Sequence, residues 1–155
     1  MRWRRFSREG RSVPKGQKKT QTVYSFVGRF RFLSNFSDLH PLTAEHVFQA
    51  MKTANAMEQI WVLMAPTPAE AKKRGRRVTL REDWEEVKDG IMERLLLHKF
   101  QDPTYHHLLL KTGDAELIEG NTWGDTYWGV CEGKGTNKLG IFLMRIRQRL
   151  QRDAE

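Results

Sequence analysis

The sequence predicts an α+β fold, a mainly helical single domain with a small β-sheet. Several segments repeat apolar residues with the helical period, whereas only two short runs near the N-terminus have the composition of strands. A length of 155 residues with 39% hydrophobic residues is enough for one domain with a hydrophobic core. No internal repeat occurs at the spacing of solenoid proteins, so one α+β domain is the economical assignment.

Helices are predicted where capping residues flank a helical repeat. Thr43 can cap a helix that begins near Ala44, and Asp83 with Glu86 three residues later resembles a capping box. Proline at the start and glycine at the end are typical of a helix over 68–75. Further helices are expected over residues 83–100, 104–113 and 139–150. The last of these has an apolar stripe formed by Leu139, Phe142, Leu143, Ile146 and Leu150.

Two strands are predicted on either side of Gly28, over residues 22–27 and 29–36. Both runs are rich in aromatic and β-branched residues, and Phe30 and Phe32 alternate with polar residues in the second. A long segment with six glycines, residues 120–140, is expected to be a loop.

The net charge of +8 is concentrated at the N-terminus. Residues 1–22 contain eight of the 27 basic side chains and one of the 19 acidic ones, so this segment carries +7. We therefore predict a basic flexible N-terminal arm over 1–22 and a catalytic domain over 23–152 that is close to neutral. Such an arm either contacts phosphates through non-specific electrostatics or is a solvated tail.

The composition favours a cytoplasmic protein without a membrane span. The longest apolar run is Ile60–Ala65, far short of the roughly 18 residues that a transmembrane helix needs. No apolar segment follows the basic N-terminus as it would in a secretory signal. The one cysteine, Cys131, excludes an intrachain disulfide and suits a reducing compartment.

The segment TAEHVFQAMK, residues 43–52, has an unusual helical face. Glu45, Phe48, Gln49 and Lys52 share one stripe at i, i+3, i+4 and i+7. If this stripe is packed, Lys52 loses hydration and its neutral amine becomes a nucleophile toward carbonyls and imines, while Glu45 can move protons. The alternative is an ordinary solvated helix face, and Phe48 argues against it.

The glycine-rich segment 124–140 is a second candidate site. Its backbone N–H groups could cradle a phosphate, although its spacing is neither a Walker A motif nor a dinucleotide fingerprint. Asp125 beside Trp123, Tyr127 and Trp128 suits a planar ligand or an oxocarbenium-like centre. Turns and core packing are the commoner roles for such glycines and tryptophans.

A third candidate is the basic run over residues 72–81, with six Lys or Arg in ten positions. It could bind a pyrophosphate or a nucleic acid, and a solvated helix end is an equal alternative. No His/Cys spacing resembles a zinc site, and no G-x-S-x-G motif is present.

Seven motifs in order resemble the NADAR/YbiA-like family. The motifs are FLSNF (32–36), EHVFQAMK (45–52), AKKRGRR (71–77), DWEEVK (83–88), KF (99–100), DTYWG (125–129) and GKGTNKLGIFLMRIR (133–147). They span about residues 23–150, which is the whole chain except the arm. The resemblance implies a mainly helical α+β domain with N-glycosidase activity, and we expect no cofactor and no metal.

The resemblance also implies roles for individual residues. Lys52, Glu45 and Asp125 are expected to be catalytic. The expected ligand contacts are Asn35, Phe36, Phe48, Gln49, Arg76, Trp84, Trp128, Gly129, Gly133, Lys134, Gly135 and Asn137. Two mechanisms fit these roles: a Schiff base on Lys52 with Glu45 as acid and base, or direct attack by water with Glu45 or Asp125 as base.

Three functions fit the resemblance, and we expect them in the following order. The first is removal of ADP-ribose from guanine in DNA, as in the antitoxins of DarT-type ADP-ribosyltransferases, with ADP-ribosylated DNA as partner and a DarT-type toxin as genetic partner. The second is a metabolic N-glycosidase that acts on riboflavin-pathway ribosylamino-pyrimidine phosphates. The third is a non-catalytic ADP-ribose-binding module, for which the retention of Glu45, Lys52 and Asp125 has no purpose.

Overall fold

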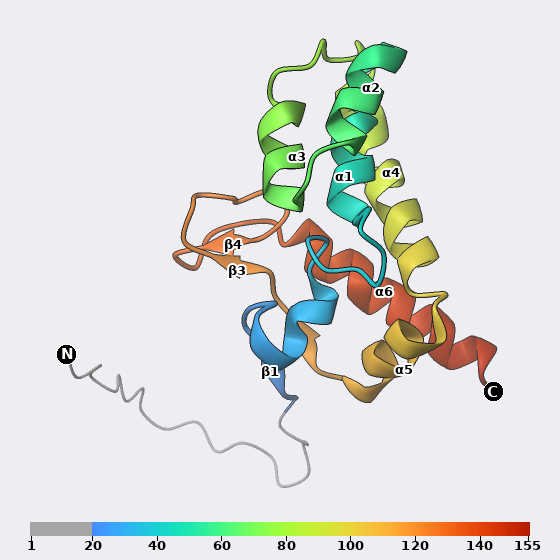
Figure 1. Ribbon diagram of the computed structural model, residues 1–155. Helices are drawn as coiled ribbons and strands as arrows, with labels where there is room; N and C mark the ends of the chain where they lie inside the picture. The colour runs from blue at the N-terminus through green and yellow to red at the C-terminus, as the bar shows by residue number, and fades with distance from the viewer. Residues whose placement is uncertain (1–19) are drawn as a thin grey trace, which may run out of the picture.

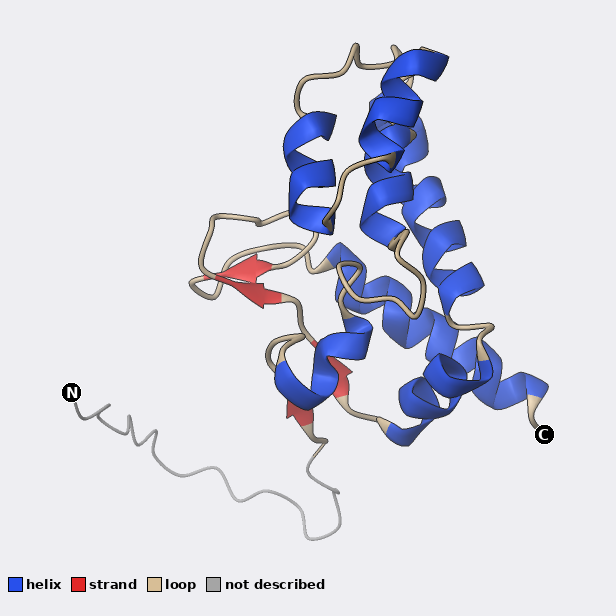
Figure 2. Cartoon of the chain, viewed as in Figure 1, coloured by secondary structure: helices blue, strands red, loops and turns tan. Residues whose placement is uncertain are grey.

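The structure, a computed structural model, describes residues 20–155 and is mainly helical (Figures 1 and 2). Most of the predicted arm lies outside the described residues. The helices are η1 (Gly28–Leu33, a 3-10 helix), α1 (Ala44–Ala50), α2 (Ala56–Leu63), α3 (Pro68–Gly75), α4 (Trp84–Lys99), α5 (Pro103–Lys111) and α6 (Lys138–Asp153). The strands are β1 (Thr22–Val23), β2 (Glu116–Leu117), β3 (Gly120–Asn121) and β4 (Val130–Cys131). The predicted fold class is confirmed.

The helices form two groups that α4 connects. Figure 1 shows α1, α2 and α3 together at one end of the molecule, and α5 and α6 at the other. Helix α4 contacts α1 in the first group and α6 in the second. None of the helices in residues 20–155 is both long and apolar enough to cross a membrane.

Capping residues in the sequence predicted the ends of α1 and α3 correctly. The Thr43 hydroxyl accepts a hydrogen bond from the His46 N–H at 3.4 Å, and the His46 ring accepts from the Thr43 N–H, which completes a capping box at α1. Helix α3 has the predicted bounds. The predicted capping box at α4 is wrong, because the Asp83 carboxylate binds the Arg81 guanidinium at 2.6 Å instead of capping the helix.

The strands are shorter than the sequence suggests. Only Thr22–Val23 of the first predicted strand pairs, in parallel with β2, and β3 pairs in parallel with β4. The second predicted strand is wrong, because the 3-10 helix η1 occupies residues 28–33. Leu33 of η1 is buried, and Phe30 and Phe32 pack against the same core. These apolar residues therefore anchor a 3-10 helix to the core and do not belong to a paired strand.

The core lies between α4, α5 and α6. All five residues of the predicted C-terminal apolar stripe on α6 are buried there. Phe48 and Trp84 also belong to this cluster of buried residues. One continuous core therefore extends from α6 to the face of α1 that carries the candidate catalytic residues.

Asn137 fastens the start of α6 to the strand connections. Its backbone has a positive φ of 49°, its side-chain amide donates to the Leu117 carbonyl at 2.9 Å, and its side-chain oxygen accepts from the Glu119 N–H at 3.0 Å. Asparagine adopts a left-handed backbone more readily than most residues. Asn137 is thus a structural clamp between α6 and the segment that follows β2.

We expect Asn137→Ala to lower the free energy of unfolding by about 2–3 kcal/mol. The substitution leaves two partly buried backbone groups without partners, at about 1–1.5 kcal/mol each, the lower part of the usual range for an unsatisfied buried group. Urea denaturation followed by circular dichroism measures the effect. Asn55→Ala, which removes only the side-chain cap of α2, is the control and should cost about 1 kcal/mol. Equal losses in the two variants would contradict the clamp.

Candidate active site

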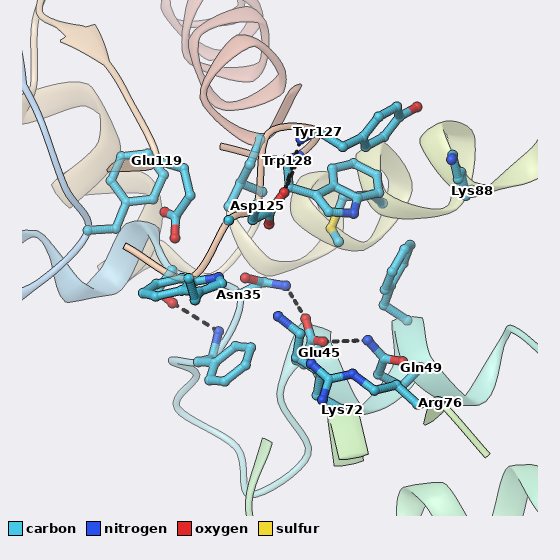
Figure 3. A pocket seen from close by; sticks show the side chains of 18 of the residues that line it. Asn35, Glu45, Gln49, Lys72, Arg76, Lys88, Glu119, Asp125, Tyr127 and Trp128 are labelled. Carbon is cyan, nitrogen blue, oxygen red and sulfur yellow. Dashed lines mark hydrogen bonds between the residues drawn. The ribbon is translucent and has the colours of Figure 1, made fainter. Parts of the chain in front are cut away.

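A cavity of about 550 Å³ opens where the two helical groups meet the glycine-rich loop. Its walls come from the segment after η1, from α1 and α3, from the first turns of α4, and from the β3–β4 connection (Figure 3). Of the predicted site residues, it is lined by Asn35, Phe36, Glu45, Phe48, Gln49, Lys52, Arg76, Trp84, Asp125 and Trp128. Segments from both halves of the described chain therefore converge on one cavity.

The stripe of α1 forms one wall of this cavity. Glu45, Phe48 and Gln49 are buried, with exposed fractions of 3%, 4% and 3%, and Lys52 is half-buried at the end of the stripe. The alternative of a solvated helix face is therefore wrong. Packing against α3 and α4 is what excludes water from this side of α1.

Glu45 is buried but has partners for both carboxylate oxygens. One oxygen accepts from the Gln49 side-chain amide at 2.6 Å, and the other accepts from the Asn35 amide (Figure 3). Burial raises the pKa of Glu45, while the Gln49 hydrogen bond and the cations Lys72 and Lys52 oppose that rise. The carboxyl is thus poised to exchange a proton inside the cavity.

Gly75 at the end of α3 permits this arrangement. A Cβ built on Gly75 would lie 2.0 Å from Oε1 and 2.9 Å from Cβ of Gln49. Only glycine lets α3 come this close to α1 without displacing the amide that holds Glu45.

Lys52 follows Glu45 by seven residues on the same stripe, lines the same cavity, and has its amine 5.9 Å from the Trp84 ring centroid. Burial lowers the pKa of Lys52, Glu45 opposes the effect, and Lys72, Arg76 and Lys88 add to it. A lysine surrounded by other cations in a partly dry cavity has a larger fraction of neutral amine than one in water. Lys52 therefore has the environment of a nucleophile.

Asp125 faces the cavity from the β3–β4 connection. One of its carboxylate oxygens accepts the backbone N–H groups of Tyr127 at 3.1 Å and Trp128 at 2.9 Å. Its own N–H donates to the Asn121 side chain at 3.0 Å. These bonds fix the carboxylate opposite α1, as Figure 3 shows.

Aromatic rings supply the apolar part of the cavity. Phe48 lies between Trp84 and Trp128, with ring centroids 5.1 Å and 5.4 Å away. All three rings line the cavity, so a planar base has an apolar surface to rest on.

The basic run over 72–81 is divided between two roles. Lys72 and Arg76 line the cavity, where Lys88 of α4 joins them. Arg74 instead binds Glu70 and the Trp61 carbonyl. Three cations around one cavity suit an anionic ligand such as a phosphate.

The remaining predicted ligand contacts, Gly129, Gly133, Lys134, Gly135 and Asn137, do not line the cavity. Gly129 and Gly135 allow close backbone approaches, since an added Cβ would lie 2.2 Å from the carbonyl oxygen of Glu119 or Gly129, respectively. Gly133 and Lys134 are exposed. Within residues 20–155, this part of the glycine-rich segment shapes the loop that presents Asp125.

Two ionisable residues of the cavity, Lys88 and Glu119, were not identified from the sequence. Lys88 follows Trp84 by four residues, so the helical period could have placed it on the same face of α4. Glu119 carries no local signal, because its position depends on Asn137 and β4. The described residues contain no cluster of three or more His, Cys, Asp or Glu side chains that could hold a metal ion.

Comparison with known proteins places these observations in a family context. A sequence model described as the NADAR domain matches residues 15–151. The chain is 41% identical over 112 residues to N-glycosidase YbiA of Escherichia coli (strain K12), covering 70% of this chain and 69% of that protein. It is 38% identical over 132 residues to N-glycosidase Npun_R5314 of Nostoc punctiforme, covering 76% and 84%.

Two further similarities concern a longer protein and a solved structure. The chain is 36% identical over 116 residues to the riboflavin biosynthesis protein VVA0006 of Vibrio vulnificus, covering 72% of this chain and 31% of that protein. The NMR structure of the E. coli protein YbiA superposes with a TM-score of 0.77 at 30% identity, covering 91% of this chain and 92% of that one.

Proposed function

Because this chain belongs to the NADAR domain family, we propose that it is an N-glycosidase that cleaves the bond between C1′ of a ribose and an exocyclic amine of a base. The substrate that we propose is guanine in DNA that carries ADP-ribose. The observation that carries the proposal is the presence of a buried carboxyl, Glu45, and a lysine of lowered pKa, Lys52, on one wall of the cavity.

The size and lining of the cavity support a nucleotide-like ligand. Its volume of about 550 Å³ lies within the usual range for small-molecule sites, roughly 300–1,000 Å³. Aromatic rings suit the base, Asp125 suits a ribose hydroxyl or positive charge at C1′, and Lys72, Arg76 and Lys88 suit phosphates.

The proposed reaction begins with opening of the ribose ring. The C1′–O4′ bond breaks as the exocyclic nitrogen forms a C1′=N double bond, and the proton of that nitrogen moves to O4′ through Glu45. The neutral Lys52 amine then adds to C1′ and transfers a proton to the nitrogen of the base. A second proton reaches the nitrogen of the base from a carboxyl of the cavity as the C1′–N bond breaks, so the base departs as a free amine and a protonated imine remains between C1′ and Lys52.

Water completes the cycle. It adds to C1′ of the lysine imine, and the C1′–Nζ bond breaks to return the amine and release the sugar. The sum is one water consumed, one ribose hydroxyl formed and one base amine released. In the competing mechanism, water displaces the base at C1′ directly with Glu45 or Asp125 as general base, and no bond to Lys52 forms.

Our choice of substrate within this class is based on the charge of the chain. The segment 1–22 carries +7, which favours a polyanion such as DNA and, with it, a cytoplasmic location and a DarT-type toxin as genetic partner. The name of the Vibrio relative supports the second candidate, a ribosylamino-pyrimidine phosphate of the riboflavin pathway. A binding module without catalysis is disfavoured, because a reader of ADP-ribose has no use for a lysine with a lowered pKa.

We expect the full chain to remove ADP-ribose from guanine in an oligonucleotide with a kcat/KM at least about 100-fold higher than for a ribosylamino-pyrimidine phosphate, a difference of roughly 2.7 kcal/mol in transition-state binding. Mass spectrometry of the released base measures both reactions under the same conditions. Cleavage of the pyrimidine alone would favour the metabolic function. Binding of ADP-ribose without cleavage of either substrate would favour the binding module.

A further inference from the structure

Glu119 is a second carboxyl of the cavity whose backbone is fixed on both sides. Its N–H donates to the Asn137 side chain at 3.0 Å, and its carbonyl accepts from the Val130 N–H at 2.8 Å. The side chain lines the cavity on the wall across from Glu45, next to Asp125 (Figure 3). The fold therefore holds this acid against the ligand space.

The two glutamates of the cavity differ in their hydrogen bonds. Both oxygens of Glu45 accept from side-chain amides, an arrangement that stabilises a carboxylate. Oε2 of Glu119 is fully buried and has no hydrogen-bond partner among residues 20–155. A buried carboxylate oxygen without a donor is costly, so this environment favours a protonated carboxyl.

The electrostatic surroundings of Glu119 act in the same direction. Burial raises the pKa of Glu119 to about 7, Asp125 adds to the rise, and Lys72 opposes it. The other ionisable groups that line the cavity are Glu45, Lys52, Arg76, Lys88 and Tyr127. The two carboxyls thus differ in geometry: both oxygens of Glu45 are held by amide donors, whereas Glu119 keeps one oxygen without a donor and, with a pKa of about 7, retains a proton for a large fraction of the time at neutral pH.

Cleavage of an N-glycosidic bond needs both kinds of group. The amine of the base is a poor leaving group unless its nitrogen takes up a proton as the bond to C1′ breaks. Glu45 already moves the proton from the exocyclic nitrogen to O4′ in the proposed ring opening, and both of its oxygens accept from amides. Two carboxyls in contrasting environments commonly divide into an acid and a base.

We propose that Glu119 is the catalytic acid that protonates the departing amine of the base. The inference rests on the proposed N-glycosidase function and holds for either mechanism. The Glu119 carboxyl gives its proton to the exocyclic nitrogen as the C1′–N bond breaks and becomes a carboxylate. In the Schiff-base mechanism, the water that next attacks C1′ gives a proton to that carboxylate and so restores the acid. In direct displacement, the general base takes the proton from water, and exchange with solvent then returns that proton to Glu119, so neither route needs an external reagent.

The test compares Glu119→Gln with wild type on whichever of the two substrates the wild type cleaves. We expect kcat to fall about 100-fold or more with KM within about threefold, the usual scale for loss of a general acid. Glu116→Gln, an exposed glutamate on β2, is the matched control and should retain wild-type activity. Glu119→Asp keeps a carboxyl and should recover part of the lost rate.

The pH profile separates an acid from a structural residue. Wild-type activity should decline as pH rises through about 7, because Glu119 loses its proton there. In Glu119→Gln this alkaline decline should vanish, and the residual rate should keep rising with pH as Lys52 becomes neutral. A decline that persists in the variant, or full activity of the variant, would overturn the proposal while leaving the N-glycosidase function intact.

A second readout does not depend on turnover. A carboxyl band in infrared difference spectra, or a ¹³C carboxyl resonance, should titrate near pH 7 in wild type and be absent from Glu119→Gln. A Glu119 carboxyl that is fully ionised at pH 6 would also overturn the proposal. Failure of wild type to cleave either substrate would instead count against the proposed function itself.

Discussion

Replacing Lys52 with alanine is expected to lower kcat by about 10³-fold or more, with KM changed only a few fold. The amine is proposed to form the bond to C1′. Without it, a water molecule in the same place would have to attack, and water is a weaker and less well positioned nucleophile. Removal of the adduct under single-turnover conditions measures the chemical step directly. Lys52→Met, which keeps the aliphatic stem beside Trp84, should be equally inactive.

The control for charge is Lys73→Ala on α3. Lys73 is exposed and lies next to Lys72, so its removal lowers the net charge by the same amount without changing the cavity lining. A variant with Lys52 replaced that retains more than about a tenth of wild-type kcat would exclude an essential nucleophilic amine. Equal losses in the Lys73 variant would assign the effect to charge rather than to chemistry.

Reductive trapping separates the two proposed mechanisms at the same residue. Borohydride added during turnover should reduce the imine and leave a stable sugar adduct on the peptide that contains Lys52. Direct attack by water forms no such imine, so a complete lack of adduct at high substrate concentration would favour that mechanism. Inactivity of Lys52→Met would then reflect an electrostatic role for the amine at the developing charge on C1′.

Five of the helices could be predicted from local sequence because nearby capping residues or an apolar repeat indicate where they begin and end. Pro68 and Gly75 mark both ends of α3, and Thr43 caps α1 through a residue three positions later. Helix α2 was not predicted, although the Asn55 side-chain oxygen caps it by accepting from two backbone N–H groups. Its exposed apolar residues Met57 and Ile60 obscure the amphipathic pattern on which such a prediction depends.

The error at η1 has a different physical origin. Alternating Phe30 and Phe32 indicate a half-buried strand only if another strand lies alongside, and a local pattern contains no information about partners. The described residues provide none at this point, and the chain forms a 3-10 helix whose rings pack against the core. Strand predictions are weaker than helix predictions because their hydrogen bonds are not local.

In the candidate site, too, the residues that a helix brings together could be predicted, and those that depend on non-local contacts could not. Glu45, Gln49 and Lys52 could be predicted as one unit because a helix brings i, i+4 and i+7 together. Glu119 could not, since its place in the cavity depends on a bond to a residue 18 positions later. The motif around 133–137 was predicted to cradle a phosphate. In the structure Gly135 allows a close approach to the Gly129 backbone, and Asn137 joins the start of α6 to the segment after β2.

Glu45→Gln is expected to lower kcat by about 10³-fold, near the middle of the usual range for loss of a positioned acid–base group. The replacement keeps the size of the side chain and removes its ability to exchange protons with Lys52 and O4′. Single-turnover removal of the adduct measures this loss. Glu70→Gln, on α3 and outside the cavity lining, changes the charge equally and should leave the rate unchanged.

The same substitution should not weaken the fold, and this distinguishes a catalytic loss from a structural one. Burial raises the pKa of Glu45, so the folded state holds the proton more tightly than the unfolded chain. The contribution of Glu45 to the free energy of unfolding is therefore greatest below the unfolded pKa of about 4.5, and it is lost as pH rises through the folded pKa. The glutamine that replaces Glu45 carries no charge to bury. Oε1 of Gln49 has no partner among residues 20–155, and turning the Gln49 amide over would let this oxygen accept from the new side chain.

The measurement is urea unfolding of wild type and Glu45→Gln at pH 5 and pH 8. From pH 5 to pH 8 the wild type should lose free energy of unfolding because Glu45 ionises, and the variant should lose less. Relative to the wild type, the variant should therefore be more stable at pH 8 than at pH 5. An inactive variant that is as stable as wild type assigns Glu45 to the chemistry of the cavity. A variant that unfolds more readily at both pH values would instead show that the carboxylate mainly holds Asn35 and Gln49 in place.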